Sequence, residues 1–368
     1  MGVGIVGCGV VGAAIAFELS KTHPVRVWDA QSPHQWQATG AALGVLMAAI
    51  TPKLKGKHLQ LRLDSLKCYD PLVLELERIA DRQLAYNRQG ILHLCFDPDE
   101  LQHWHKTQQV RSQQGFRLDI LDQTQLAQIY PHLHMAHLLA APAPVVGAIY
   151  SPQDRQIDPV SLAEALITAA QKNGAQVAFN RPITHFKTLS GNDPQVVTHI
   201  CTATECHPVD WVILSAGLGS TPLTTHLQQT VPIYPVLGQA LHLQRQQPLL
   251  RPMPVVNGDR LHIVPINASE VWVGATVEFP AQVGDAVAAD PAQLRELHQR
   301  AIALDASLAN AKVLRTWFGL RPRPHERPAP IIERLPGYAN VVVASGHYRN
   351  GVLLAPITAQ KVRQLISD

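Results

Sequence analysis

The sequence predicts a mixed α/β protein in which a dinucleotide-binding unit is interleaved with a second region built on an antiparallel sheet. Three observations lead to this expectation. A buried strand, a helix of small residues and a second strand follow one another in the first thirty residues. A helix with clear start and stop signals begins at Asp158 and is followed by short strands. Residues 231–280 alternate short strands with Pro and Gly turns, as antiparallel sheets do.

The N-terminal elements are predicted from the spacing of apolar residues. Residues 2–6 form a buried strand, and Val10 to Leu19 keep small apolar residues at helical spacing. Pro24 stops this helix. Residues 25–28 form the second strand, which ends at Asp29. The start of the chain is therefore expected to be a β-α-β unit.

The rest of the chain is predicted to hold further helices and strands. Thr39 to Ile50 is rich in Ala, Gly and Leu and almost free of charge, which indicates a buried helix. The other predicted elements, in chain order, are a helix pair over 59–85, a strand at 91–96, a helix opened by Asp97 and Pro98, a short helix at 121–130, a helix from Asp158 to Asn173, strands at 176–179, 196–201 and 211–214, a helix over 290–309, a strand at 341–344 and a closing helix over 353–366 that Pro356 delimits or kinks.

Length and composition are those of a folded protein with room for two lobes. The 368 residues are 46% hydrophobic and 16% charged, which provides a large core and too little charge for a disordered chain. The net charge of +3 includes no run of five basic residues, and the densest group is Lys53, Lys55 and Lys57. We interpret these lysines as part of a solvated loop and expect no nucleic-acid partner.

Cellular location is inferred from apolar runs and cysteines. No apolar run reaches the roughly eighteen residues that a membrane span requires, and the N-terminal apolar stretch has no basic leader. The cysteines are odd in number and form no C-x-x-C pair, which favours reduced thiols over a disulfide framework. We therefore expect a soluble, cytoplasmic protein without a membrane span. The cysteines are Cys8, Cys68, Cys95, Cys201 and Cys206.

Glycines at the first strand-to-helix turn form a dinucleotide-binding motif. Gly7, Gly9 and Gly12 give G-x-G-x-x-G between the predicted strand and helix. Such glycines allow a tight turn, close approach of a pyrophosphate and close helix packing, while free N–H groups at the helix start attract phosphate. Asp29 ends the second strand, where a carboxylate accepts hydrogen bonds from a ribose. The motif does not distinguish FAD from NAD, and a cofactor-free glycine turn is the alternative.

The chain resembles the D-amino-acid oxidase superfamily along its whole length, and within it the glycine oxidases of thiamine synthesis. The resemblance rests on the glycine motif with Asp29 and on four further segments, of which the last two are the most specific. These segments are Thr39 to Gly44, Ile213 to Gly217, Thr316 to Pro322 and Gly346 to Gly351. The resemblance implies FAD as the cofactor.

The same resemblance implies the domain organisation. It predicts an FAD-binding, Rossmann-like domain of the glutathione-reductase type, interleaved with an α+β substrate domain on an antiparallel sheet. The FAD-binding domain is assigned residues 1–85, 150–220 and 335–368. The substrate-binding domain is assigned residues 86–149 and 221–334.

The resemblance also implies which residues hold FAD. Asp29 would bind the adenosine ribose, Ile183 would contact adenine, and the segment from Gly346 to Leu353 would pass the flavin pyrimidine, where a helix N-terminus stabilises negative charge. Because no cysteine follows Arg321 at the attachment position of related sarcosine oxidases, we expect non-covalent FAD. The cofactor-binding set is Gly7, Gly9, Val10, Val11, Gly12, Asp29, Ala30, Thr39, Ala41, Ala42, Gly44, Ile183, Ala216, Gly217, Arg321, Gly346, Tyr348, Arg349, Asn350, Gly351, Val352 and Leu353.

Two arginines in the most specific segments are expected to serve the substrate. Oxidation of an amino acid by a flavin transfers a hydride from Cα to flavin N5 and requires mainly orientation from the protein. A guanidinium group suits this task because its planar fork pairs bidentately with a carboxylate. We expect Arg321 to bind the substrate carboxylate and Arg349 to lie close to the flavin and support the pocket. A structural ion pair is the alternative for both.

Two positions depart from the pattern of the glycine oxidases. They usually have Tyr where this chain has His262, and the family often has a basic residue where this chain has Leu237. His262 is a candidate for bonding a carboxylate or acting on the amine proton, with a packing or surface role as the alternative. Tyr348 is a further candidate to face the pocket. The catalytic candidates are therefore Arg321, Arg349, His262 and Tyr348.

The numerous histidines suggest a metal site, which we reject. None of those considered has a carboxylate or Cys partner at ligand spacing. They are His103, His105, His132, His134 and His137. We also interpret Cys8, inside the glycine turn, as a packing residue and not as a redox thiol.

The predicted function is oxidation of glycine, sarcosine or a small D-amino acid to the imino acid, with oxygen as the acceptor. One alternative is a D-amino-acid dehydrogenase that reduces a quinone or another carrier. Another is the flavin half of enzymes that modify the tRNA wobble uridine, which residues 39–57 resemble and the modest charge argues against. A third is a non-catalytic flavoprotein acting as an assembly or interaction subunit. The sequence leaves the substrate and the oligomeric state open and is compatible with a homo-oligomer.

Overall fold

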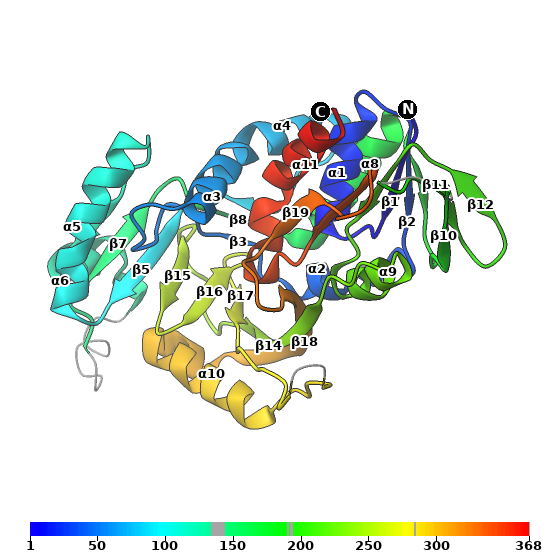
Figure 1. The fold of residues 1–368 in the computed structure, drawn as a ribbon. Coiled ribbons are helices and arrows are strands. Elements are labelled where there is room, and N and C mark those ends of the chain that lie inside the picture. Colours follow the sequence, from blue (N-terminus) through cyan, green and yellow to red (C-terminus); the bar gives the residue numbers. More distant parts are fainter. Residues whose placement is uncertain (134–143, 190, 192–193, 283–284, 368) are drawn as a thin grey trace.

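Two large sheets form the framework of the protein (Figure 1). The computed structural model describes residues 1–133, 144–189, 191, 194–282 and 285–367. The first large sheet has six strands and the second has eight. Two three-stranded sheets complete the set found in the described residues.

The six-stranded sheet is the parallel part of the fold. All neighbouring strands run parallel except the pair β19 and β20. Every residue of β1 and β20 is buried, as expected for parallel strands with both faces covered. In spatial order the strands are β19 (Ile331–Arg334), β20 (Val341–Ser345), β13 (Trp211–Leu214), β1 (Val3–Val6), β2 (Val25–Trp28) and β9 (Gln176–Ala178).

Helices cover one face of this sheet, and a small sheet with a short helix covers the other. Ile5 packs with the helices and Val6 with the small sheet, because successive residues of a strand face opposite sides. The helices, which pack against one another, are α1 (Val10–Ser20), α8 (Pro159–Lys172) and α11 (Gly351–Ser367). The opposite face carries β10 (His185–Thr188), β11 (Val197–Cys201), β12 (Cys206–Pro208) and α9 (Ser220–His226).

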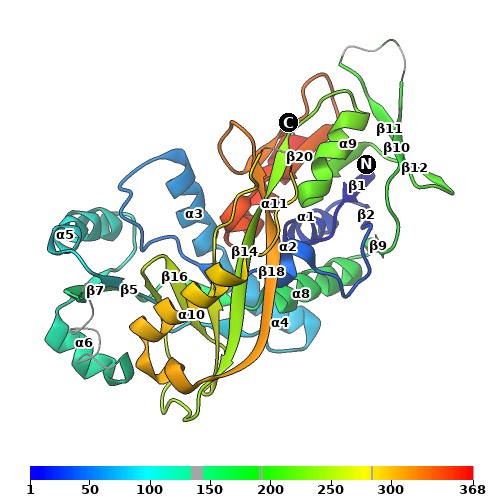
Figure 2. The same cartoon turned by 90° about the horizontal axis from the view of Figure 1, so that it is seen from below.

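The eight-stranded sheet is antiparallel apart from the pair β5 and β15. Its strands, in spatial order, are β18 (Lys312–Pro324), β14 (Ile233–Gln244), β17 (Glu270–Gly274), β16 (Leu261–Pro265), β15 (Val255–Gly258), β5 (Ile91–Cys95), β7 (Gly147–Ser151) and β6 (Asp119–Leu121). Helix α10 (Pro291–Leu304) packs along β14, β16 and β17. At the other end lie α5 (Pro98–Gln113) and α6 (Gln123–Ile129) (Figure 2). A separate hydrophobic core fills this half.

The remaining elements connect the two large sheets, between which the chain crosses several times. They are α2 (Gln37–Ala41), β3 (Val45–Leu46), α3 (Lys57–Lys67), α4 (Tyr69–Ala80), β4 (Tyr86–Asn87) and β8 (Arg155–Ile157), with the short helices η1 (Pro131–Leu133), η2 (Gly217–Gly219), η3 (Ala306–Asn310) and η4 (Tyr348–Asn350). Strand β19 pairs with the six-stranded sheet although it lies in the range 221–334 that we assigned to the substrate domain. We propose the predicted domain limits with this strand moved to the cofactor domain.

Elements with strong local signals agree with the sequence predictions. The β1-α1-β2 unit is present, and helices α3 and α4 occupy most of the range 59–85. The side chain of Asp97 caps α5 by accepting from the N–H of Asp99, and Asp158 caps α8 by accepting from the N–H of Ser161. In the described part of the chain no helix is both long and apolar enough to cross a membrane.

The predicted helix from Thr39 to Ile50 is wrong. Helix α2 ends at Ala41, and the chain continues through β3 into an irregular loop, residues 47–53. Gly44 has φ +69, and a Cβ there would overlap the carbonyl oxygen of Ile157. The composition suggested burial correctly, but β3 pairs with β8, and several backbone groups of residues 47–53 bond to distant side chains.

Buried charged side chains hold the 47–53 loop. Asp154 is fully buried, and its carboxylate accepts from the N–H groups of Ala48 (2.6 Å), Ala49 (2.9 Å) and Ile50 (2.8 Å). Burial raises the pKa of Asp154, and these hydrogen bonds oppose that rise. Arg111 of α5, also fully buried, donates to the carbonyl oxygens of the loop on alternate residues. These acceptors are Ala49, Thr51 and Lys53.

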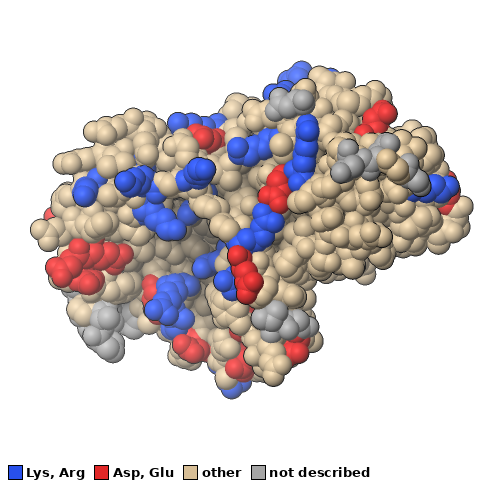
Figure 3. Space-filling model, in the orientation of Figure 1, with Lys and Arg blue, Asp and Glu red and all other residues tan. Residues whose placement is uncertain are grey.

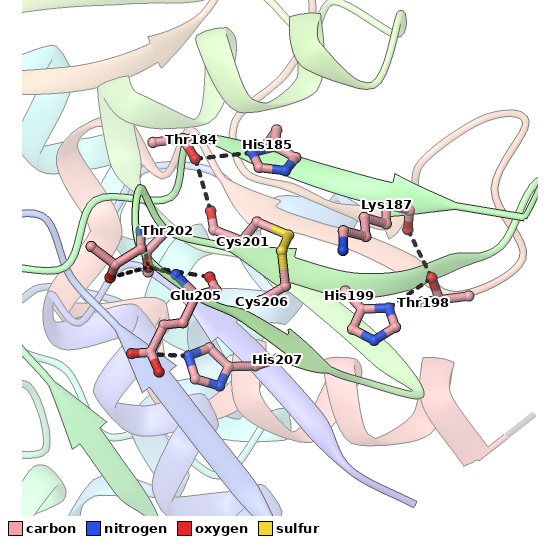
Figure 4. Close-up of a disulfide and its surroundings, with 11 residues drawn as sticks. Thr184, His185, Lys187, Thr198, His199, Cys201, Thr202, Glu205, Cys206 and His207 are labelled. Atoms are coloured by element: carbon pink, nitrogen blue, oxygen red, sulfur yellow. Dashed lines mark hydrogen bonds and ion pairs between the residues drawn. A yellow bond between two sulfur atoms is a disulfide. The ribbon is translucent and has the colours of Figure 1, made fainter.

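The prediction of reduced thiols is wrong for Cys201 and Cys206. These residues lie directly opposite each other on β11 and β12 and form a disulfide (Figure 4). The other three cysteines are free. An odd count and the lack of a C-x-x-C pair say nothing about two cysteines that a tight hairpin brings together. The cysteines therefore give no support to a cytoplasmic location.

We expect Asp154→Asn to lower the free energy of unfolding by about 2–4 kcal/mol, because an amide replaces a charged acceptor of buried N–H groups. Chemical denaturation with the folded state checked by circular dichroism measures the change. Asp97→Asn is the matched control, since Asn and Asp are comparable N-cap residues. Equal stability of the two variants would contradict the importance of the Asp154 network.

Candidate functional site

A cavity of about 850 Å³ extends from the parallel sheet to the antiparallel sheet. It begins beyond the carboxyl ends of β1, β2 and β13, where ligands bind in open α/β sheets. It ends against β14, β16 and β18. Lys and Arg side chains border a hollow in the middle of the face shown in Figure 3. The volume falls in the range of pockets for cofactors and small molecules.

The glycine turn shapes one end of the cavity. Gly7 has φ +99, and a Cβ there would lie 2.6 Å from the Cα of Ala216. A Cβ at Gly12 would overlap the carbonyl oxygen of Gly7. Gly12 therefore packs α1 onto the turn and does not line the cavity, unlike Gly7 and Gly9. The hydroxyl oxygen of Thr39 accepts from the N–H of Val10 at 3.0 Å and ties α2 to the start of α1.

Asp29 lies beside this turn with its carboxylate fixed by the backbone. Its oxygens accept from the N–H groups of Cys8 (2.6 Å) and Gln31 (2.8 Å). Asp29 lines the cavity, and a carboxylate has further lone pairs to accept from ribose hydroxyls. Burial and the charge of Asp29 raise the pKa of the Cys8 thiol, so Cys8 stays protonated at neutral pH.

The opposite end of the cavity is formed by the start of α11. Gly351, Val352 and Leu353 line it, so the positive end of the helix dipole faces the space. Side chains of α3 and α4 hold this turn in place. Ser65 Oγ donates to the carbonyl oxygen of Leu353 at 2.6 Å, and the Tyr69 hydroxyl donates to that of Val352.

A proline inside α11 explains the second of these bonds. Pro356 has no N–H to donate to the carbonyl oxygen four residues earlier, which belongs to Val352. The Tyr69 hydroxyl fills the vacated position. Pro356 therefore neither delimits nor breaks the helix, which runs from residue 351 to residue 367.

Arg321 reaches the cavity from β18. Its Nη1 donates to the carbonyl oxygen of Leu237 at 3.0 Å. The guanidinium lies directly over Gly238 on the neighbouring strand β14, where any Cβ would overlap it. Burial lowers the pKa of Arg321, and the charge of Arg349 adds to this effect. Leu237 is fully buried and makes this contact through its backbone carbonyl. The contact therefore does not require the basic side chain that the family often has at this position.

His262 lines the cavity from β16 and belongs to a chain of hydrogen bonds. Its Nδ1 lies 3.1 Å from Asn257 Nδ2, while Asn257 Oδ1 lies beside His93 Nδ1. His93 Nε2 lies 2.9 Å from a carboxylate oxygen of Glu100. Burial and, next, the charge of Arg349 lower the pKa of His262 to about 4. With Asn257 donating to Nδ1, the neutral ring carries its proton on Nε2.

The structure brings the predicted site residues together in this one cavity, with Gly12 as the exception. Those that line it are Gly7, Gly9, Val10, Val11, Asp29, Ala30, Thr39, Ala41, Ala42, Gly44, Ile183, Ala216, Gly217, His262, Arg321, Gly346, Tyr348, Arg349, Asn350, Gly351, Val352 and Leu353. Arg62 of α3 also lines the cavity and was missed. The available signal was its place among Leu59, Leu63 and Leu66, on the apolar stripe of the helix.

The absence of a metal stays a prediction. His103 and His105 lie exposed on α5, whereas His134, His137 and the side chain of His132 lie outside the described residues. Two other groups with ligand atoms lie close together, and their sequence spacing did not reveal them. They are His93 with Cys95 and Glu100, and His185 with Cys201 and Cys206. In the second group the sulfur atoms are already bonded to each other.

Comparison with known proteins identifies the family. A family model described as FAD dependent oxidoreductase (DAO) matches residues 3–365. The bifunctional protein ThiO/ThiG of Synechocystis is 30% identical over 99% of this chain, which spans about half (51%) of that relative's length. Glycine oxidase of Geobacillus kaustophilus is 28% identical over 99% of this chain and 92% of its own.

Solved structures agree with this assignment. The crystal structure of the Geobacillus kaustophilus glycine oxidase has a TM-score of 0.84, at 27% identity, and covers 99% of this chain and 94% of its own. The predicted fold class is thereby confirmed. Because the matched family model spans nearly the whole chain, this protein belongs to the DAO family of FAD-dependent oxidoreductases, and FAD is its cofactor.

Proposed function

We propose that this protein oxidises a small amino acid, with glycine, sarcosine and small D-amino acids as candidates, to the imino acid with oxygen as the electron acceptor. The substrate loses a hydride from Cα and a proton from nitrogen, and oxygen takes up the two electrons to give hydrogen peroxide. The observation that carries the proposal is Arg321, a partly buried guanidinium that lines the cavity and has no ion-pair partner among the described residues.

The residues around the cavity fit FAD. Gly7 and Gly9 line the cavity without side chains. The N-cap residue Gly9 does not cap α1, so the N–H groups of the first turn suit a pyrophosphate, apart from that of Val10, which donates to Thr39. Asp29 would bind the ribose, and Ile183 would lie against adenine. The start of α11 would stabilise negative charge on the ring. When bound, FAD supplies the acceptor for the hydride at its N5 atom.

The carboxylate of the substrate would bind at Arg321. In the described part of the chain neither Arg321 nor Arg349 forms an ion pair with a carboxylate, which argues against a purely structural role for either. The Leu237 carbonyl occupies one N–H of Arg321 and fixes the direction of the fork. The remaining N–H groups are free to bind bidentately.

His262 would donate a hydrogen bond to the same carboxylate. Its Nδ1 is occupied by Asn257, so Nε2–H is the group left for a ligand. A ring in this tautomer presents a donor, as a Tyr hydroxyl does, and does not remove a proton from the amine. The amine would therefore have to arrive neutral.

Two predictions from the sequence complete the proposal. FAD is bound without a covalent link, as the lack of a cysteine after Arg321 predicts. The protein acts in the cytoplasm. The lack of an apolar run of membrane-spanning length supports this location, whereas the cysteines do not. The modest net charge of +3 argues against the tRNA-modifying alternative, which requires a strongly basic face.

The first experiment follows the visible flavin band of the purified holoenzyme without oxygen while glycine, sarcosine, D-alanine and D-proline are added in turn. We expect at least one to bleach the band, and admission of air to restore it rapidly. Slow restoration would favour a dehydrogenase that uses another carrier. A flavin band that none of these amino acids changes would refute the proposed reaction.

Arg321→Lys is expected to weaken substrate binding by about 1.5–3 kcal/mol, because Lys keeps the charge but loses one charge-assisted hydrogen bond of the bidentate pair. Gly238→Ala should act in the same direction, because its Cβ displaces the Arg321 guanidinium without altering charge. Dissociation constants come from anaerobic titration of the flavin band. Arg315→Lys, an exposed position on the same strand, is the control. Unchanged binding by both site variants would remove Arg321 from the substrate site.

The low pKa of His262 predicts a flat pH dependence for anion binding. A histidine of ordinary pKa becomes cationic below about 6.5 and would then tighten the binding of an anion. His262, with its pKa lowered to about 4, stays neutral across this range. The dissociation constant of propionate, measured by perturbation of the flavin spectrum, should therefore not change between about pH 5.5 and 8. Tightening near pH 6.5 that disappears in His262→Phe would show that the pKa is not lowered.

A further inference from the structure

Arg62 adds a third guanidinium group to the lining of the cavity that Arg321 and Arg349 also line. Arg62 and Ser65 lie three residues apart on α3 and therefore share one face of this helix, while Tyr69 begins the next helix, α4. Ser65 and Tyr69 bond to the start of α11. Arg62, one turn earlier, lines the cavity, and its charge interacts with that of Arg349.

The hydrogen bonds of Arg62 leave most of its charge uncompensated. Its Nη2 donates to the carbonyl oxygen of Met47. Its Nε is buried and has no hydrogen-bond partner among the described residues. No carboxylate of the described residues lies within ion-pair distance of it. Asp154 exerts an attraction on Arg62, but its oxygens already accept from three N–H groups of the 47–53 loop.

The surrounding charges call for an additional anion. Arg62, Arg321 and Arg349 line the cavity, and the only acidic residue among the described lining residues is Asp29, at the glycine turn. Burial lowers the pKa of Arg62, and Arg349 lowers it further. A partly buried cation next to like charges is costly unless an anion joins it. With the FAD pyrophosphate at the start of α1, as proposed above, a substrate whose single carboxylate binds Arg321 supplies no anion to Arg62.

We propose that Arg62 binds a second carboxylate of the substrate, so that the preferred substrates are amino acids with two carboxylates, such as iminodiacetate or D-aspartate. This inference rests on the proposed function and narrows its substrate class. The bond chemistry is the same as for glycine, since the hydride leaves the Cα next to nitrogen and the second carboxylate remains intact. Arg321 orients the reacting end and Arg62 the other end.

The test measures equilibrium binding with non-reacting acids, so that it does not depend on catalysis. Malonate and succinate are compared with acetate and propionate by perturbation of the flavin spectrum in the holoenzyme. We expect the diacids to bind about ten times more tightly or better, which corresponds to about 1.4 kcal/mol. Arg62→Gln, whose amide can still donate to the Met47 carbonyl, should abolish this preference and leave monoacid binding within about twofold.

Controls separate a binding role from a structural one. Lys67→Gln removes a positive charge from an exposed position on the same helix and should retain the preference. Arg62→Lys, which keeps the charge, should recover part of it. Retention of FAD and the midpoint of unfolding are measured for every variant. Loss of FAD or equal weakening of all four acids in Arg62→Gln would assign Arg62 to the cofactor or the loop and overturn the inference.

Anaerobic reduction of the flavin then distinguishes the inference from the function on which it rests. Iminodiacetate and D-aspartate are added beside glycine and sarcosine. Bleaching by glycine with no diacid preference in either binding or reduction would overturn the role of Arg62 and leave the proposed function intact. A diacid preference in binding with no bleaching by any amino acid would overturn the proposed function, whereas the anion site at Arg62 would stand.

Discussion

The structure depends on a segment that has no regular structure of its own. The 47–53 loop lies between the two sheets and would leave its backbone groups unsatisfied in a buried position. The carboxylate of Asp154 accepts hydrogen bonds from three of the loop's N–H groups. The guanidinium groups of Arg111 and Arg62 donate to several of its carbonyl oxygens. These side chains come from different parts of the chain, so the loop forms only when both halves are assembled. One of them, Arg62, also faces the cavity.

Features with local causes could be predicted from the sequence. The glycine turn, the caps at Asp97 and Asp158 and the β1-α1-β2 unit all depend on residues a few positions apart. The 47–53 loop could not be predicted, since its partners Asp154 and Arg111 are 106 and 62 residues away from the groups that they bind. Its composition shows burial but not which groups satisfy the backbone.

The residues of the site also divide into those that the sequence indicates and those that it does not. Arg321 and Arg349 were found through the segments that resemble a family, and nothing in their own spacing indicates a cavity. Arg62 lies outside those segments, and only its position on an apolar stripe sets it apart. The tautomer of His262 follows from Asn257, His93 and Glu100, which three separate elements contribute. Spacing along the chain contains no information about such a network.

The interaction between Pro356 and Tyr69 has a consequence for how related sequences can vary. The proline removes a hydrogen bond inside α11, and the tyrosine at the start of α4 supplies a replacement for the same acceptor. Each residue without the other carries a cost: the hydroxyl would lose its buried acceptor, or the carbonyl its donor. The two positions should therefore change together among related proteins, and joint substitution should be tolerated better than either change alone. Covariation of these two positions, which lie on helices far apart in the sequence, would then indicate the hydrogen bond from Tyr69 to the carbonyl of Val352, which no local pattern reveals.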